Sequence, residues 1–137
     1  MIVADASLVV KLFLNEPDSQ QVRTRWREWA RMGEVVLAPA LLWPETVSTL
    51  RRSVHRGILS EAEGDLAFGA LEELEIDVRE PAGLYRAAWA LAQRFRRPTV
   101  YDCCYLALAE MAGCDLWTAD QRLLNAVGAS LPWVRSP

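Results

Sequence analysis

Four carboxylates stand out in this chain of 137 residues, because each lies in or directly beside an apolar stretch. Carboxylates that come within a few ångströms repel one another, so at least one pKa must rise unless a cation neutralises the site. Oxygen ligands of this kind suit Mg²⁺ or Mn²⁺, and such ions activate water and stabilise a phosphate group in transfer. The four residues are Asp5, Glu45, Asp102 and Asp120.

Other catalytic chemistries find little support in the residue types. His55 is the only histidine, no Gly-rich phosphate loop is present, and the three cysteines form no Cys-x-x-Cys pair. We therefore expect no Ser-His-Asp triad, no zinc cage and no disulfide framework. A net charge of −3 also argues against a protein that coats nucleic acid through bulk charge.

The elements that must position these carboxylates are short apolar runs that alternate with helical patterns. This alternation is typical of an α/β fold with a buried parallel sheet. Because ligands bind at the carboxyl ends of strands in such sheets, three of the four acids should reach that edge by topology alone. We predict strands over 2–4, 35–37, 76–78, 116–118 and 131–134, and helices over 7–14, from 17 to about 30, and over 41–56, 60–75, 82–95, 99–111 and 120–127.

The chain reads as one domain over residues 1–137, since no linker, repeat or low-complexity stretch divides it. Its longest apolar stretch, Val35 to Pro44, is too short to span a bilayer. No targeting segment is evident at the N-terminus, so we expect a cytoplasmic protein without a membrane partner.

Helix capping is the alternative explanation for the same acids. Asp5 and Asp120 each precede a predicted helix, where Asp is a favoured N-cap, and Asp102 stands three residues after Thr99 as in a capping box. Glu45, near a helix start, would also suit the helix dipole. Capping does not predict that all four residues meet at one sheet edge, and this joint placement is the argument for a site.

Several segments together resemble the PIN-domain nucleases, and in particular the VapC-type toxins of toxin–antitoxin pairs. The resemblance covers essentially the whole chain. The most specific match is the segment Tyr101-Asp102-Cys103-Cys104-Tyr105-Leu106-Ala107-Leu108-Ala109-Glu110. The other matching segments are Val3-Ala4-Asp5-Ala6-Ser7, Pro44-Glu45-Thr46-Val47-Ser48-Thr49-Leu50 and Thr118-Ala119-Asp120-Gln121-Arg122-Leu123-Leu124.

This resemblance implies a PIN-like three-layer α/β/α sandwich with a central parallel sheet, and hydrolysis of RNA phosphodiester bonds by a metal-activated water. Asp5 and Asp102 would be the principal ligands of Mg²⁺ or Mn²⁺. Glu45 and Asp120 would complete the pocket, and the hydroxyl of Thr118 would orient one of these groups. The resemblance further implies a cognate antitoxin and a homodimer.

Two other functions stay open from the sequence alone. One is a phosphoryl-transfer enzyme with Asp5 as nucleophile, although Ser7 stands where a second Asp would be expected. The other is a non-catalytic PIN-like binding module whose acids serve as helix caps. RNA phosphates have two candidate contacts on helix faces, the row Arg23, Arg27 and Arg31 and the cluster Arg51, Arg52 and Arg56.

Overall fold

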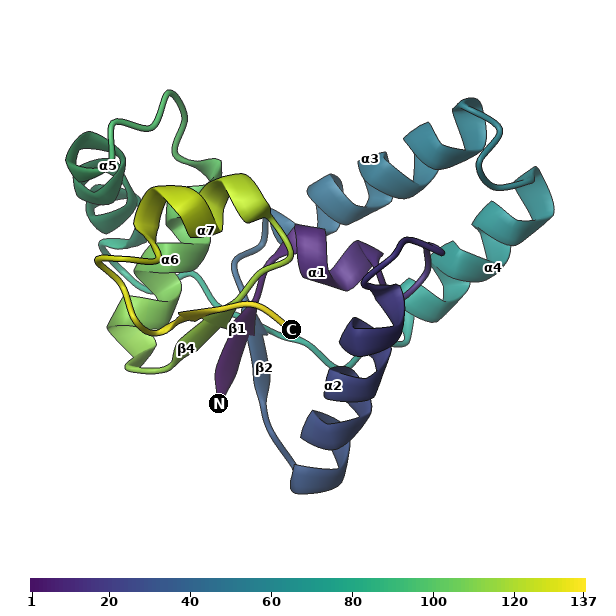
Figure 1. The fold of residues 1–137 in the computed structure, drawn as a ribbon, viewed down its shortest axis with the longest axis horizontal. Helices are drawn as coiled ribbons and strands as arrows, with labels where there is room; N and C mark the ends of the chain where they lie inside the picture. The colour runs from purple at the N-terminus through teal and green to yellow at the C-terminus, as the bar shows by residue number, and fades with distance from the viewer.

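A parallel sheet with strand order β3-β2-β1-β4-β5 forms the centre of the molecule (Figure 1). The computed structural model describes all residues from 1 to 137. All four strand pairings are parallel, and five strands alternate with seven helices in the order that the sequence pattern predicts. The strands are β1 (Ile2–Ala4), β2 (Val36–Ala38), β3 (Asp77–Val78), β4 (Asp115–Trp117) and β5 (Val134–Arg135).

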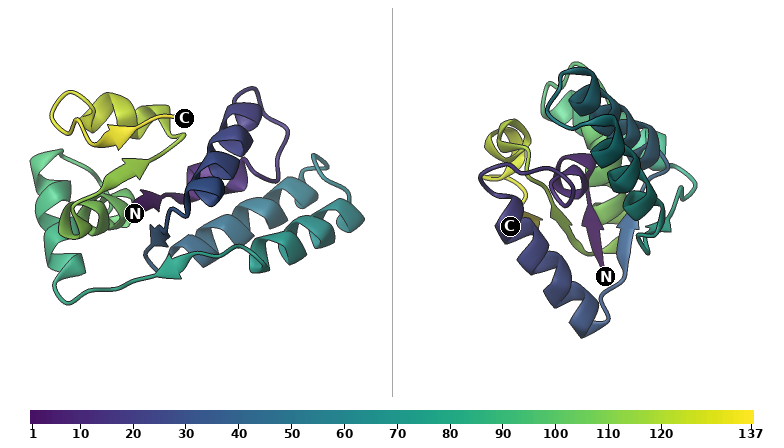
Figure 2. Two further views of the ribbon diagram at one scale, coloured as in Figure 1. Left: turned by 90° about the horizontal axis from the view of Figure 1, so that it is seen from below. Right: turned by 90° about the vertical axis from the view of Figure 1, so that its right-hand side faces the viewer.

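Helices connect every pair of successive strands and flank the sheet, which gives the predicted α/β sandwich. In the left-hand view of Figure 2, α2, α3 and α4 lie on one side of the strands, and α5 with α6 lies on the other. None of the helices combines the length and apolar character needed to cross a membrane. The helices are α1 (Ala6–Val10), α2 (Ser19–Met32), α3 (Leu42–His55), α4 (Glu61–Glu72), α5 (Leu84–Arg94), α6 (Tyr101–Ala112) and α7 (Gln121–Val127).

Strands β1 and β2 are apolar throughout because helices cover both faces of a parallel sheet. Every residue of β1 and β2 is buried, and α6 contributes an unbroken buried stretch from Cys103 to Ala109. Local signals set the helix ends. Ser60 and Glu63 form the predicted capping box of α4, and Gly113 ends α6 in the left-handed conformation.

Most predicted boundaries are shifted from those of the structure, and two of these errors have a clear physical cause. The last strand occupies Val134–Arg135 and not 131–134, because Leu131 is buried in the preceding turn and Pro132 has no N–H to donate to a strand partner. The first helix ends at Val10. Beyond it, Leu12 and Phe13 donate to carbonyls three residues earlier, so the chain tightens into turns instead of continuing as an α-helix.

Candidate active site

All four carboxylates singled out in the sequence line one cleft of about 720 Å³. Asp5 stands at the end of β1, Glu45 in the first turn of α3, Asp102 in the first turn of α6, and Asp120 at the start of α7. The cleft therefore lies at the carboxyl edge of the sheet, between elements that are distant in sequence. Joint placement at this edge is the feature that helix capping alone does not account for.

Strand register places Asp5 beside Thr118. Ala4 pairs with Trp117, so the next residues along the two parallel strands, Asp5 and Thr118, leave the sheet together. The Asp5 side chain is only 6% exposed, and its Oδ2 accepts a hydrogen bond from the Thr118 hydroxyl. Its Oδ1 accepts from the Ser7 hydroxyl at 2.7 Å and from the backbone N–H of Leu8 at 2.9 Å. Both carboxylate oxygens are thus fixed.

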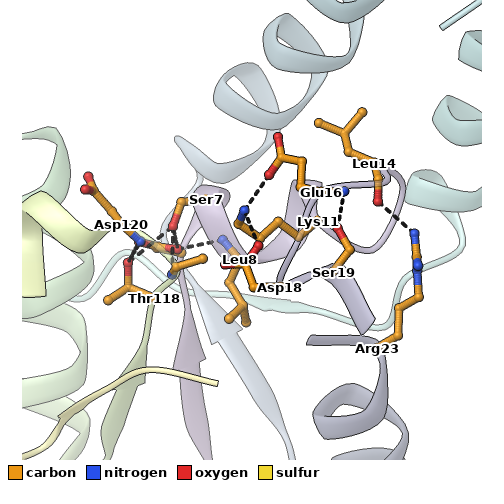
Figure 3. Close-up of polar contacts among 12 residues, drawn as sticks. Ser7, Leu8, Lys11, Leu14, Glu16, Asp18, Ser19, Arg23, Thr118 and Asp120 are labelled. Atoms are coloured by element: carbon orange, nitrogen blue, oxygen red, sulfur yellow. Dashed lines mark hydrogen bonds and ion pairs between the residues drawn. The ribbon is translucent and has the colours of Figure 1, made fainter. Parts of the chain in front are cut away.

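The two hydroxyls also tie the start of α1 to the segment before α7 (Figure 3). The Ser7 and Thr118 oxygens lie 3.2 Å apart. Backbone N–H groups then donate to them, Ala119 to the Ser7 hydroxyl and Asp120 to the Thr118 hydroxyl, each at 3.0 Å. This network fixes Asp5 relative to Asp120, and it bears out the expected orienting contact of Thr118.

Burial raises the pKa of Asp5 from 3.8 to about 6. Hydrogen bonds from Thr118, Ser7 and the Leu8 amide act in the opposite direction, because they stabilise the charged form. The nearby charge of Asp102 raises the pKa further. No basic side chain is paired with Asp5, so its negative charge is uncompensated within the protein.

Glu45 reaches the cleft from α3 and is held by α6. Its Oε2 accepts a 2.8 Å hydrogen bond from the hydroxyl of Tyr105, which is almost fully buried. Burial raises the pKa of Glu45, the Tyr105 bond lowers it, and the charge of Asp102 raises it again. The charge of Asp102 thus acts on the pKa of two other members of the quartet in the direction expected for neighbouring like charges.

Asp102 does not cap its helix, so the predicted capping box with Thr99 is wrong. Val100 occupies the N-cap of α6 and makes no side-chain capping bond. The Asp102 carboxylate instead accepts a 3.0 Å ion-paired hydrogen bond from Arg97. Asp5 and Asp120 do cap α1 and α7, as predicted, so these two residues combine a capping contact with a place in the cleft.

Some of the basic side chains near the cleft are already bound by other groups of the chain and are not available to a phosphate. Lys11 lines the cleft but is bound by Glu16 and, at 2.6 Å, by Asp18 (Figure 3). Arg23 donates to the carbonyls of Leu12 and Leu14, and so it holds the connection between α1 and α2.

The arginines of α3 divide in the same way. Arg51 pairs with Glu61 of α4 at 2.9 Å and does not line the cleft. Arg52 lines both the cleft and a neighbouring hollow between residues 13–16 and α3, and it makes no ion pair. Of the two, Arg52 is the one in position to contact a phosphate in the cleft.

Three residues that hold the carboxylates were not identified from the sequence: Ser7, Tyr105 and Arg97. Tyr105 contacts Glu45 across 60 positions of the chain, whereas Ser7 and Arg97 lie two and five residues from the acids that they contact. The contact of Ser7 could have been predicted from its position two residues after Asp5, because serine hydroxyls commonly bond polar groups nearby in the chain.

Comparison with known proteins places the chain in a family. The sequence profile of the PIN domain matches residues 2–129. Ribonuclease VapC12 of Mycobacterium tuberculosis is 35% identical over 135 residues, and the alignment covers 93% of each chain.

Two solved structures share the fold. VapC20 of M. tuberculosis, described as a sarcin–ricin loop cleaving toxin, has a TM-score of 0.67 at 20% identity and covers 93% of this chain and 95% of its own. A chain of a toxin–antitoxin complex from Klebsiella pneumoniae has a TM-score of 0.63 at 15% identity, with 98% and 96% covered. The chain is therefore a member of the PIN-domain family and is related over nearly its whole length to the VapC ribonucleases.

Proposed function

We propose that this protein is a divalent-metal-dependent endoribonuclease and the toxin of a toxin–antitoxin pair. The observation that carries the proposal is the gathering of four carboxylates in one cleft at the carboxyl edge of the sheet. The ribonuclease name of VapC12 and the toxin description of VapC20 support it. The alignments with these two proteins cover almost the full length of each of them.

The donor set of the cleft fits Mg²⁺ or Mn²⁺. Asp5 and Glu45 have no basic partner, and uncompensated oxygen donors are the ligands that these ions prefer. As arranged, no three acidic, histidine or cysteine side chains are grouped closely enough to hold an ion. Binding therefore requires side-chain movement, and release of Asp102 from Arg97 is the step that we expect. When bound, the cation would lower the pKa of a coordinated water and neutralise phosphate charge.

The residues of the chain have separate tasks in this proposal. Asp5 and Asp102 would be the principal ligands, with Glu45 and Asp120 completing the pocket. Thr118 and Ser7 hold Asp5 in one orientation, which limits the reorganisation needed at this residue when the cation binds. Arg52 would contact a substrate phosphate at the side of the cleft where α3 lies.

An antitoxin partner and a homodimer belong to the same proposal. The Klebsiella chain that shares this fold was solved as part of a toxin–antitoxin complex. Co-expression with the neighbouring open reading frame, followed by purification, tests the partner. Light scattering of the purified chain tests the dimer.

The test of the activity is cleavage of a single-stranded RNA with and without Mg²⁺ or Mn²⁺. We expect cleavage only with the metal, and a loss of activity in Asp5→Asn. Glu110→Gln is the matched control, because Glu110 is exposed at the far end of α6 from Asp102 and lies outside the cleft. Metal-independent cleavage, or full activity of Asp5→Asn, would contradict the proposal. Phosphate trapped covalently on Asp5 would instead favour phosphoryl transfer.

A further inference from the structure

A different hollow lies near the candidate active site, where α5 ends and α6 begins. It has a volume of about 380 Å³ and is lined by Trp89 on α5 and by the segment from Arg96 to Val100. This size lies within the usual range for small-ligand sites. In Figure 1 the two helices lie together on the side of the sheet away from α3 and α4.

The hollow combines an exposed aromatic face with positive charge. Trp89 is 63% exposed, although tryptophan is among the side chains that proteins usually bury most. Arg96 and Arg97 line the same hollow, and no acidic side chain does. An aromatic face beside arginines is the combination that binds single-stranded nucleic acid, since bases stack on the ring and phosphates meet the guanidinium. Arg97 is paired with Asp102, so Arg96 is the arginine of the hollow that has no ion-pair partner.

Arg96 is also the only non-glycine residue with a positive φ, at 51°. It follows the end of α5, a place where many helices use glycine because a side chain in this conformation is strained. Arg96 adopts this strained conformation, and it lines the hollow. Strained backbone of this kind is frequent where a side chain has a binding role.

The hollow borders the cleft at two points. Val100 lines the hollow, and the next residue, Tyr101, lines the cleft with its side chain 60% exposed. Arg97 lines the hollow and donates to Asp102 of the cleft at 3.0 Å. An RNA strand that leaves the cleft past Tyr101 would therefore come next to the hollow.

We propose that this hollow is a subsite for one nucleotide of single-stranded RNA next to the scissile phosphate, with the base stacked on Trp89 and a phosphate on Arg96. The proposal rests on the proposed ribonuclease function and adds to it the residues that hold the substrate on this side of the cleft. The rival occupant of an exposed aromatic face is a second copy of the chain, and the experiment separates the two.

The experiment measures binding of a fluorescein-labelled, ten-nucleotide, mixed-sequence single-stranded RNA by anisotropy, in the Asp5→Asn background without metal, so that no cleavage interferes. In this background we compare Trp89→Ala, Trp89→Phe and Arg96→Asn. Asn removes the charge but tolerates the left-handed backbone. The matched controls are Tyr85→Ala and Arg86→Gln, because both residues are exposed on α5 and line neither the hollow nor the cleft.

We expect Trp89→Ala to raise the Kd by about fivefold or more, the loss associated with one stacked base. Trp89→Phe should retain most of the affinity. Arg96→Asn should reduce the slope of log Kd against log salt by about 0.7, the value for one lost phosphate contact on a single strand. If Arg96 had only a structural role, Arg96→Asn would leave this slope unchanged. Both control variants should bind as the parent does.

Three results would overturn the subsite. The first is parent-like RNA affinity in Trp89→Ala, and the second is an unchanged salt slope in Arg96→Asn. The third is a dimer of the parent that becomes a monomer in Trp89→Ala by light scattering, which would assign the face to a second copy. If the parent itself binds no RNA, the proposed function fails, and that result is distinct from the other three.

Discussion

The hydroxyl of Tyr105 donates a 2.8 Å hydrogen bond to Oε2 of Glu45, and so it joins α6 to α3 within the cleft. Burial raises the pKa of the Tyr105 phenol, and the charge of Glu45 raises it further. The phenol therefore keeps its proton throughout the physiological range and remains a donor to Glu45. This contact gives a buried side chain a part in positioning an acid of the candidate active site.

Replacing Tyr105 by Phe should slow RNA cleavage by about tenfold, since a hydrogen bond to a charged group contributes about 1.5–3 kcal/mol and Glu45 would lose its orientation. The ring that fills the core is retained, so we expect the free energy of unfolding to change by only about 1 kcal/mol. Single-turnover cleavage and urea unfolding measure the two effects separately. Tyr85→Phe is the control, because the Tyr85 hydroxyl bonds Glu80 at 3.1 Å on the exposed surface. Equal cleavage rates for Tyr105→Phe and Tyr85→Phe would show that Tyr105 does not orient Glu45.

The raised pKa of Asp5 predicts how the stability of the metal-free protein depends on pH. Below about pH 3 the carboxyl is largely protonated in both the unfolded and the folded chain. Between pH 4 and 6 the unfolded chain loses this proton while the folded chain keeps it, because the folded pKa is about 6 and the ordinary value is 3.8. The contribution of Asp5 to stability therefore falls as pH rises, by about 3 kcal/mol in total.

Asp5→Asn isolates this effect because it removes the titration and keeps a side chain that caps helices well. In EDTA, the free energy of unfolding of the variant minus that of the wild type should rise between pH 4 and 7. Urea unfolding at several pH values measures the difference. A constant difference across this range would mean that Asp5 titrates normally in the folded protein.

The neighbouring residues Arg51 and Arg52 should respond differently to charge reversal. Arg52 lines the cleft without an ion-pair partner, whereas Arg51 is paired with Glu61 outside it. We expect Arg52→Glu to weaken RNA binding by about tenfold or more at moderate salt, since it replaces a phosphate contact with repulsion. Arg51→Glu should have a much smaller effect. Anisotropy titrations at two salt concentrations measure both, and equal losses would show that only net charge matters.

Much of the fold could be predicted because its signals are local. The apolar runs that become β1 and β2, the capping box at Ser60 and the helix end at Gly113 are each encoded within a few residues. Asp5 could be placed at a strand end for the same reason. Its location next to a buried strand distinguishes it from acids on the surface.

The contacts that orient the acids could not be predicted in the same way, because they depend on packing between distant segments. Ser7 meets Thr118 across 111 positions only because β1 and β4 pair in a particular register. Tyr105 meets Glu45 across 60 positions through the packing of two helices. For Asp102 the local pattern misled, since the capping box with Thr99 competes with the ion pair to Arg97, and the ion pair forms.

The central claim is that the four carboxylates act as one cation-binding site, and calorimetric titration with Mn²⁺ tests it most directly. The account predicts that the wild type binds Mn²⁺, that Asp5→Asn and Asp102→Asn each lose about tenfold or more in affinity, and that Glu110→Gln binds as the wild type does. Asp5→Asn should also melt no lower than the metal-free wild type at neutral pH, because repulsion among the carboxylates is relieved. A wild-type protein that binds no Mn²⁺, or Asn variants that bind it undiminished, would contradict the account.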